Sequence, residues 1–389
     1  MALDPLFTFS DAQWALYLVL MQLPLILQPS QYRPLFFVPI LALTVYTAFS
    51  TKGRFLDDYY NSLQWMTYFF FASDYILMTD VQRELRQVPG DADTKNGIEN
   101  ASLWRRFCWA NSLFFSPRGV GWAHEPTDSL PPHPPLNISR TRFVLQRLRS
   151  AVVFFLIHDL CNLHVRANPM FYPEGPGWRS DGWLWRYIVT VSWALSASTA
   201  LCLIFSLLSV LAVVTRFSEP QAWPALMGRP GDAYTIRRFW GRTWHQLMRR
   251  FVSSHGRRLV QFLGLRRGKN PSAYTQLFVA FFISGVVHYA AEVIAMRNYA
   301  GMAMIFFMLQ PCGIMLEDFV IWCGRRAGWE SDKWNYVGYF TTLTWFALVG
   351  PLWQETLVRE GQMTEGLPVS VIMGVWKGQW VHGPFPTLH

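Results

Sequence analysis

Apolar residues along this chain gather into runs that are almost free of charged side chains. Most of these runs have the length that a helix needs to cross about 30 Å of hydrocarbon, which is about 20 residues. The pattern therefore predicts membrane spans, with the third and fourth interrupted by polar residues. The predicted spans are 12–28, 34–50, 63–78, 151–165, 187–215, 274–296, 302–323 and 337–353. We expect one all-α polytopic membrane domain over residues 1–389, with about seven or eight transmembrane or re-entrant helices.

Two polar segments interrupt this pattern. Residues 79–149 are Pro-rich and carry basic clusters, which is typical of a loop outside the membrane. The loop contains the sequon Asn137-Ile138-Ser139, but its basic flanks favour the cytoplasmic side, where a sequon is not used. The second segment, 237–269, holds ten Arg or Lys residues and no Asp or Glu. Its apolar residues recur at roughly helical spacing, which predicts an amphipathic helix at the membrane surface.

Composition agrees with a membrane location. Hydrophobic residues make up 51% of the 389 residues and charged residues only 15%, against about 25% charged in soluble domains. We expect an integral membrane protein of the endoplasmic reticulum. The net charge of +9 comes mostly from arginine, which suits cytoplasmic flanks or an anionic ligand better than nucleic acid. The five cysteines show neither a disulfide framework nor a zinc spacing, so we predict no metal site.

The span 274–296 carries an unusual polar stripe. Ser284, His288 and Glu292 follow at four-residue intervals and therefore lie on one helical face. Ionisable groups at this depth are costly and usually face a protein interior or a watery cavity. A neutral His288 could take a proton from a hydroxyl that attacks a thioester, with Glu292 or Ser284 fixing its tautomer. A purely structural hydrogen bond from His288 to a neighbouring helix remains the alternative.

Three segments carry a resemblance to a known family. FWGRTWHQ at 239–246 is preceded by AWPALMGRP at 222–230 and followed by SGVVHYAAE at 284–292. Together they resemble the membrane-bound O-acyltransferase superfamily in its wax-synthase-like branch. The segment RRFCWANSLFFSPRGVGW at 105–122 is similar to fungal members that acylate terpenoid and meroterpenoid secondary metabolites. The resemblance covers most of the C-terminal half of the chain.

This resemblance implies a helical bundle around a reaction tunnel, which acyl-CoA enters from the cytosol. His288 falls on the intramembrane histidine of the family and is the expected general base. His245 falls on the second polar position of the family and is the second catalytic candidate, although a positioning or structural role would fit equally well. Trp244 is a candidate orienting or tunnel-lining residue, with packing or anchoring at the membrane interface as the alternative. The basic segment would meet the phosphates of CoA or lipid headgroups. The candidate phosphate contacts are Arg242, Arg249 and Arg250.

The sequence thus predicts an acyl-CoA-dependent O-acyltransferase. We expect it to move an acetyl group from acetyl-CoA, a co-substrate rather than a bound cofactor, to a hydroxyl of a hydrophobic terpenoid. Two alternatives remain. A wax or sterol ester synthase would use long acyl chains, and a membrane transporter would use His288 and Glu292 as a proton relay. No inverted repeat of the kind that transporters show is visible in the sequence.

Overall fold

The computed structural model describes residues 11–50, 53–88, 97–296, 300–364 and 366–387. In these residues the chain is helical, and extended backbone pairs only at two isolated bridges, Gln87 with Trp122 and Val369 with Val381. The predicted all-α class is therefore confirmed. Part of the predicted loop, 89–96, lies outside the described residues. The α-helices are α1 (Asp11–Ile26), α2 (Phe37–Ser50), α3 (Phe55–Ala72), α4 (Val81–Glu84), α5 (Leu103–Phe114), α6 (Arg140–Ala167), α7 (Gly182–Val214), α8 (Ile236–Arg238), α9 (Arg249–Phe262), α10 (Asn270–Ala295), α11 (Met302–Arg326), α12 (Trp334–Val349), α13 (Pro351–Arg359) and α14 (Val371–Lys377).

Shorter helical turns join these elements. Two of them are π-helices, which are rare and often occur at functional sites. They are η2 (Ser73–Met78), which continues α3, and η8 (Phe239–Thr243), which continues α8. The remaining turns are the 3₁₀-helices η1 (Arg33–Phe36), η4 (Ile98–Asn100), η5 (Pro169–Phe171), η6 (Pro220–Ala222) and η7 (Pro230–Asp232).

Five helices in the described residues are long and apolar enough to cross a membrane. They cover Arg33–Ser50, Arg140–Ala167, Gly182–Val214, Asn270–Ala295 and Met302–Arg326. Large apolar side chains on α7, among them Leu207, Leu208 and Leu211, are exposed on the protein surface. Such a surface suits lipid better than water. The chain is therefore an integral membrane protein, while the number of seven or eight membrane elements stays a prediction.

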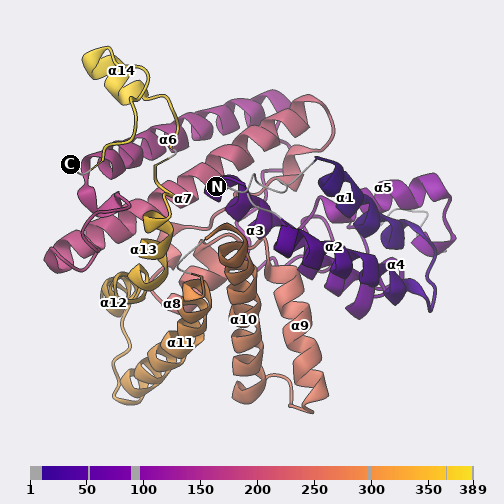
Figure 1. Ribbon diagram of the computed structural model, residues 1–389. Helices are drawn as coiled ribbons and strands as arrows, with labels where there is room; N and C mark the ends of the chain where they lie inside the picture. Colours follow the sequence, from indigo (N-terminus) through magenta and orange to yellow (C-terminus); the bar gives the residue numbers. More distant parts are fainter. Residues whose placement is uncertain (1–10, 51–52, 89–96, 297–299, 365, 388–389) are drawn as a thin grey trace. The chain divides into compact units, whose positions relative to one another are not determined.

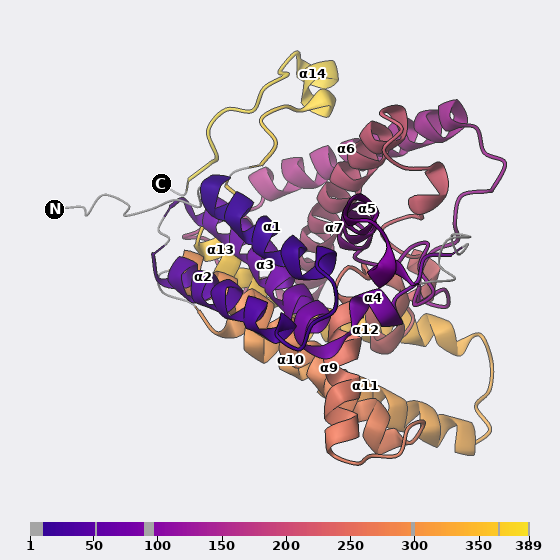
Figure 2. The same cartoon turned by 90° about the vertical axis from the view of Figure 1, so that its right-hand side faces the viewer.

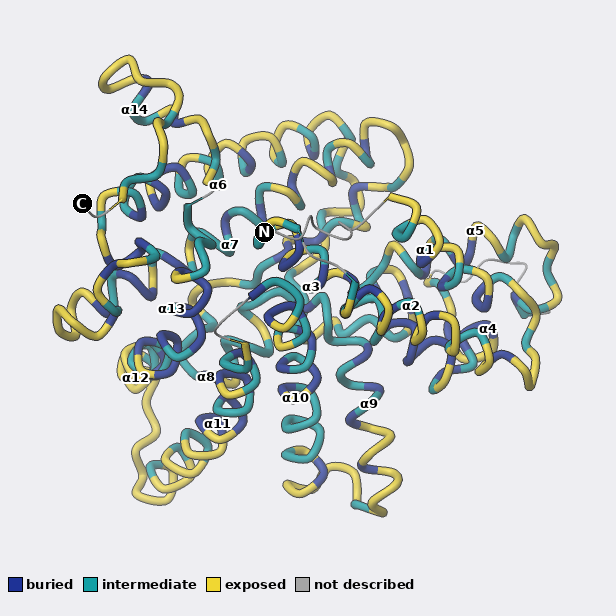
Figure 3. The backbone as a smooth tube through the Cα atoms, viewed as in Figure 1, coloured by how far each residue is buried: buried dark blue, intermediate teal, exposed yellow. Residues whose placement is uncertain are grey.

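The chain divides into two compact units. The first contains Met1–Pro126 and Leu247–Pro311, and the second contains Thr127–Gln246 and Cys312–His389. In the first unit, α10 packs along both α3 and α9 (Figure 1). The approach of α9 is close, because a Cβ added to Gly256 would lie 3.2 Å from the Cα of Gln276. Phe251 on α9 is fully buried, whereas Phe262 at its end is 86% exposed, a gradient visible in Figure 3.

In the second unit, α6 and α7 form a long helical pair whose members lie side by side in both views (Figures 1 and 2). The helix α6 begins at Arg140, inside the segment that the sequence assigns to the loop. The Ser139 hydroxyl caps it by accepting the Arg142 backbone N–H at 3.2 Å. A capped helix continues through polar residues when its backbone groups are satisfied. The apolar run therefore marks only the part of α6 that suits lipid.

The helix α12 passes tightly along a backbone segment of the same unit. A Cβ on Gly338 would lie 2.2 Å from the carbonyl oxygen of Tyr234. The neighbouring Tyr339 hydroxyl donates a hydrogen bond to the Gly231 carbonyl at 2.7 Å, which holds the two segments together. A side chain at position 338 must therefore push them apart.

We predict that Gly338→Ala destabilises the protein. Forcing a methyl group into a filled contact costs about 1–3 kcal/mol. Thermal unfolding of the detergent-solubilised protein should show a lower Tm for this variant. Gly383→Ala is the control, because a Cβ there meets no atom within 4 Å. Equal Tm values for the two variants would contradict the close contact.

Candidate active site

His288 lies two thirds of the way along α10, in the first unit. Its side chain is half-buried, and its ring stacks on Phe307 of α11 with the centroids 4.7 Å apart and the planes at 20°. The hydroxyl of Tyr59 on α3 lies 3.5 Å from His288 Nδ1, at the outer limit of a hydrogen bond. Catalytic hydrogen bonds are often long before substrate binds. The imidazole is thus held by two other helices, through a ring face and one nitrogen.

Tyr59 is a site residue that the sequence does not reveal. It is almost completely buried on the first turns of α3, beside Asp57 and Asp58. Nothing in that local pattern distinguishes it from a tyrosine that only fills the core. Its contact with His288 joins positions 229 residues apart, so only the packing of α3 against α10 makes it visible.

The other two residues of the polar stripe have different contacts. The Ser284 hydroxyl donates to the Ala280 carbonyl at 2.9 Å, within its own helix. The fully buried Glu292 carboxylate accepts the backbone N–H groups of Gly301 at 2.7 Å and Ala303 at 2.9 Å. These N–H groups belong to the start of α11, where a negative charge is favourable. Glu292 therefore caps α11 and ties the end of α10 to the start of α11.

We predict that Glu292→Ala lowers the stability of the protein more than Glu292→Gln does. Alanine leaves two buried N–H groups without an acceptor, at a cost of about 1–3 kcal/mol each, whereas the amide of glutamine keeps one acceptor. Thermal unfolding measures the difference, with the exposed Glu330→Gln as control. If Glu292→Ala kept the Tm of the unmutated protein and lost only activity, the carboxylate would act in the chemistry instead.

His245 belongs to the second unit, where the two flanking motifs form one local structure. The Gly228 N–H donates to the Thr243 carbonyl at 2.9 Å, and a Cβ on Gly228 would meet the Arg242 carbonyl oxygen at 1.9 Å. Only glycine permits this approach of the segment 222–230 to the π-helix η8. The Gln246 amide donates to the carbonyls of Trp240 and Trp244 and closes the turn around His245.

The surroundings of His245 are aromatic and anchored to α11. Its half-buried ring lies 5.4 Å from the ring of Trp244, which stacks on Phe239 at 5.7 Å. On α11, Glu317 accepts the Ile236 N–H at 3.0 Å, just before η8. The motif thus holds His245 in a fixed turn, as either a catalytic or a positioning role requires.

The three candidate phosphate contacts differ in their environment. Arg250 is largely buried and donates to Asp74 at 2.8 Å and to the Thr79 hydroxyl at 3.1 Å, so it forms an internal ion pair. Arg249 is half-buried, and burial lowers the pKa of its guanidinium, which nonetheless stays charged. Arg242 is exposed on η8 in the second unit. Arg249 and Arg250 belong to the first unit, which also contains His288. Arg242 and Trp244 belong to the second unit, which also contains His245.

These features define a class of protein. It is a helical membrane protein with one histidine on an apolar helix, held by contacts from two other helices, and a second histidine in the turn that follows a π-helix. The model of the family described as "Membrane bound O-acyl transferase family" matches residues 223–309, which include both histidines. Acetyltransferase ple2 of Rhodocybe pseudopiperita is 37% identical over 97% of this chain and 98% of its own length. Acetyltransferase eriL of Hericium erinaceus is 34% identical over 90% of this chain and 91% of its own.

A further relative has a different name. O-Mevalon transferase macI of Penicillium terrestre is 28% identical over 73% of this chain and 68% of its own length. The chain belongs to the membrane-bound O-acyltransferase family, which confirms the resemblance of its motifs. It is an acyltransferase of the membrane, for which acyl-CoA and an alcohol are the implied substrates. This assignment replaces the transporter alternative.

Proposed function

We propose that this protein transfers an acetyl group from acetyl-CoA to a hydroxyl of a hydrophobic terpenoid or meroterpenoid in the endoplasmic reticulum membrane. The observation that carries the proposal is His288, a half-buried imidazole on an apolar helix with a hydroxyl at Nδ1 and an aromatic ring on its face. The names of ple2 and eriL support acetyl as the group transferred. The name of macI refers to another group, so the acyl group varies among relatives.

His288 would act as the general base of a direct transfer. We assign the Nδ1 proton to a hydrogen bond donated to the Tyr59 oxygen. In the proposed reaction Nε2 is the atom that accepts the proton of the acceptor hydroxyl. As Nε2 takes the hydroxyl proton, the oxygen attacks the thioester carbonyl and forms a tetrahedral intermediate. The C–S bond then breaks, and the CoA thiolate takes the proton back from the imidazolium. The products are the ester and free CoA, with no covalent enzyme intermediate.

The remaining candidates would serve this reaction from the motif and the basic segment. We keep His245 as the second catalytic candidate and Trp244 as a tunnel-lining residue, because the fixed turn around them presents both rings together. Ser284 and Glu292 would support the helix that carries the base. Arg242 and Arg249 are candidate contacts for CoA phosphate or lipid headgroups, and Arg250 would contribute through its ion pair with Asp74.

We predict that His288→Ala abolishes most of the acetyl transfer. Loss of a general base typically reduces the rate by about 10²–10⁴-fold. Membranes that contain the protein would be assayed with acetyl-CoA, and separately with a long-chain acyl-CoA, against a panel of hydroxylated terpenoids. His133→Ala, in an exposed loop, is the control. Undiminished transfer by well-expressed His288→Ala would refute the mechanism, and transfer only from the long-chain donor would favour the ester synthase alternative.

We predict that Tyr59→Phe lowers kcat about tenfold, since loss of one hydrogen bond to an imidazolium in the transition state is worth roughly 1.5 kcal/mol. The KM for acetyl-CoA should change little, because Tyr59 contacts the base and not the donor. The phenylalanine ring keeps the packing, so Tm should be preserved. Tyr60→Phe is the matched control, since Tyr60 is exposed on the next position of α3. A lower Tm with unchanged kcat would make Tyr59 purely structural.

A further inference from the structure

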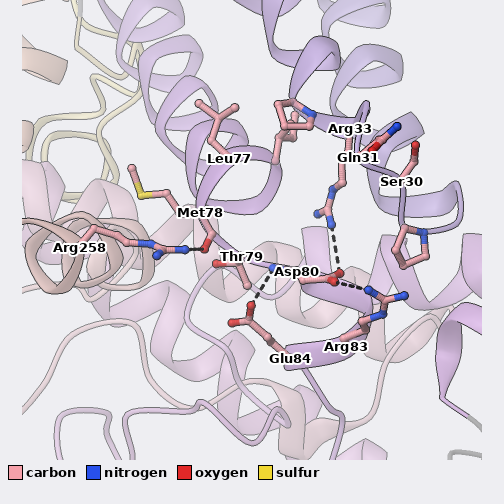
Figure 4. Close-up of a pocket in the computed structure, with 13 residues that line it drawn as sticks. Ser30, Gln31, Arg33, Leu77, Met78, Thr79, Asp80, Arg83, Glu84 and Arg258 are labelled. Atoms are coloured by element: carbon pink, nitrogen blue, oxygen red, sulfur yellow. Dashed lines mark hydrogen bonds and ion pairs between the residues drawn. The ribbon is translucent and has the colours of Figure 1, made fainter. Parts of the chain in front are cut away.

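A hollow of about 470 Å³ lies in the first unit, where η2 ends (Figure 4). Its walls come from three parts of the chain, residues 29–34, residues 76–84 and Arg258 of α9. Three guanidinium groups line it, those of Arg33, Arg83 and Arg258, against the two carboxylates of Asp80 and Glu84. The lining thus has a positive charge excess beside apolar side chains such as Ile76 and Met78.

Most of the charged groups around the hollow are engaged with one another. Asp80 pairs with Arg33 at 3.4 Å and with Arg83 at 3.3 Å, and Glu84 accepts the Asp80 backbone N–H at 3.0 Å. Arg33 is more than nine-tenths buried and also donates to the Tyr75 carbonyl. These contacts pair the Asp80 carboxylate with two guanidinium groups, hold the Glu84 carboxylate at a backbone N–H, and fix the wall of the hollow on one side.

Arg258 differs from the other two arginines. It is exposed, and its one hydrogen bond to the described residues runs from Nη2 to the Met78 carbonyl at 2.7 Å. That bond holds the guanidinium beside Met78, at one side of the residues that line the hollow (Figure 4), while Nε and Nη1 keep their donors for a ligand. A guanidinium with two available donors matches the oxygens of a phosphate group.

The hollow and the proposed base, His288, lie at different positions along the packed helices α9 and α10. Gly256, two residues before Arg258, packs against Gln276 of α10. Twelve residues of α10 separate Gln276 from His288, which is about 18 Å along the helix axis. Coenzyme A has a comparable layout, because a long pantetheine arm joins its phosphorylated nucleotide to the thioester sulfur.

We propose that this hollow binds the phosphorylated end of the acyl donor, with Arg258 as the phosphate contact. The inference rests on the proposed function and names the donor site within it. It moves the phosphate contact away from Arg250, whose guanidinium is held by Asp74. Phosphate is also the chemistry of lipid headgroups, so the experiment has to separate the two sources.

The test compares Arg258→Gln with Arg266→Gln in nanodiscs. Glutamine keeps a donor for the Met78 carbonyl, and Arg266 is a basic residue of the same α9–α10 segment that does not line the hollow. Losing one charged hydrogen bond to the donor should raise the KM for acetyl-CoA about tenfold in Arg258→Gln. In the same variant kcat should stay within about twofold. Arg266→Gln should leave both constants unchanged, and Arg258→Lys should recover part of the affinity.

A second donor, the acetyl thioester of N-acetylcysteamine, carries neither nucleotide nor phosphate. The unmutated protein and Arg258→Gln should use it equally well, and an equal loss with both donors would overturn the proposal. An unchanged KM for acetyl-CoA in Arg258→Gln would also overturn it. A third result would also overturn it: activity that depends on the fraction of anionic lipid in the unmutated protein but not in Arg258→Gln, with the same KM for both. That result would assign the hollow to a lipid headgroup.

Calorimetric titration of CoA into the same nanodiscs separates this inference from the proposed function. CoA binding that weakens about tenfold in Arg258→Gln would support the hollow as the CoA site, even if no acetyl transfer were detected. If acetyl transfer is observed but the unmutated protein and Arg258→Gln bind CoA equally well, the proposed function stands. The assignment of the hollow as the CoA site is then overturned.

Discussion

A buried charge among apolar helices must be paired, because neither lipid nor the protein interior hydrates it. Asp74 shows how strongly this constraint acts here. It is completely buried on η2, and Arg250 reaches it from α9 at 2.8 Å while also donating to Thr79. Removing one partner of such a pair typically costs about 3–5 kcal/mol. The ion pair therefore fixes α9 against η2, and through α9 it fixes the position of α10, which carries His288.

The need to pair buried polar groups also explains why Ser284, His288 and Glu292, the polar stripe of α10, have different contacts. Glu292 is satisfied by the backbone of α11, and Ser284 by its own helix. His288 instead meets a hydroxyl and an aromatic ring from two other helices. The Glu292 carboxylate is fixed by two backbone N–H groups, whereas the partners described for the His288 imidazole are neutral groups. Three residues with one spacing therefore contribute a cap, a helix contact and the proposed base.

The sequence predicts those features that depend on local pattern. Apolar length predicts the long helices, and the cost of an ionisable group inside an apolar span singles out His288. Asp74 also stands out in the sequence, but its partner does not, since Arg250 is one of ten basic residues in its segment. The roles proposed for Tyr59 and Arg258 rest on contacts between helices that are distant in the chain. No periodicity within α3 or α9 encodes those contacts.

Charge placement offers a physical reason for separating the donor phosphates from the base. Phosphate groups are costly to desolvate, so they are best bound where water and arginine side chains remain accessible. The hollow beside η2 would provide such a place, because Arg258 is exposed there and the end of α9 emerges from the core. The thioester and the pantetheine arm carry no net charge and can pass along apolar helices at lower cost. A base about 18 Å further along α10 would then meet only the neutral part of the donor. Under this arrangement the phosphates and His288 lie apart along the same helix, and only the neutral thioester end of the donor reaches the imidazole.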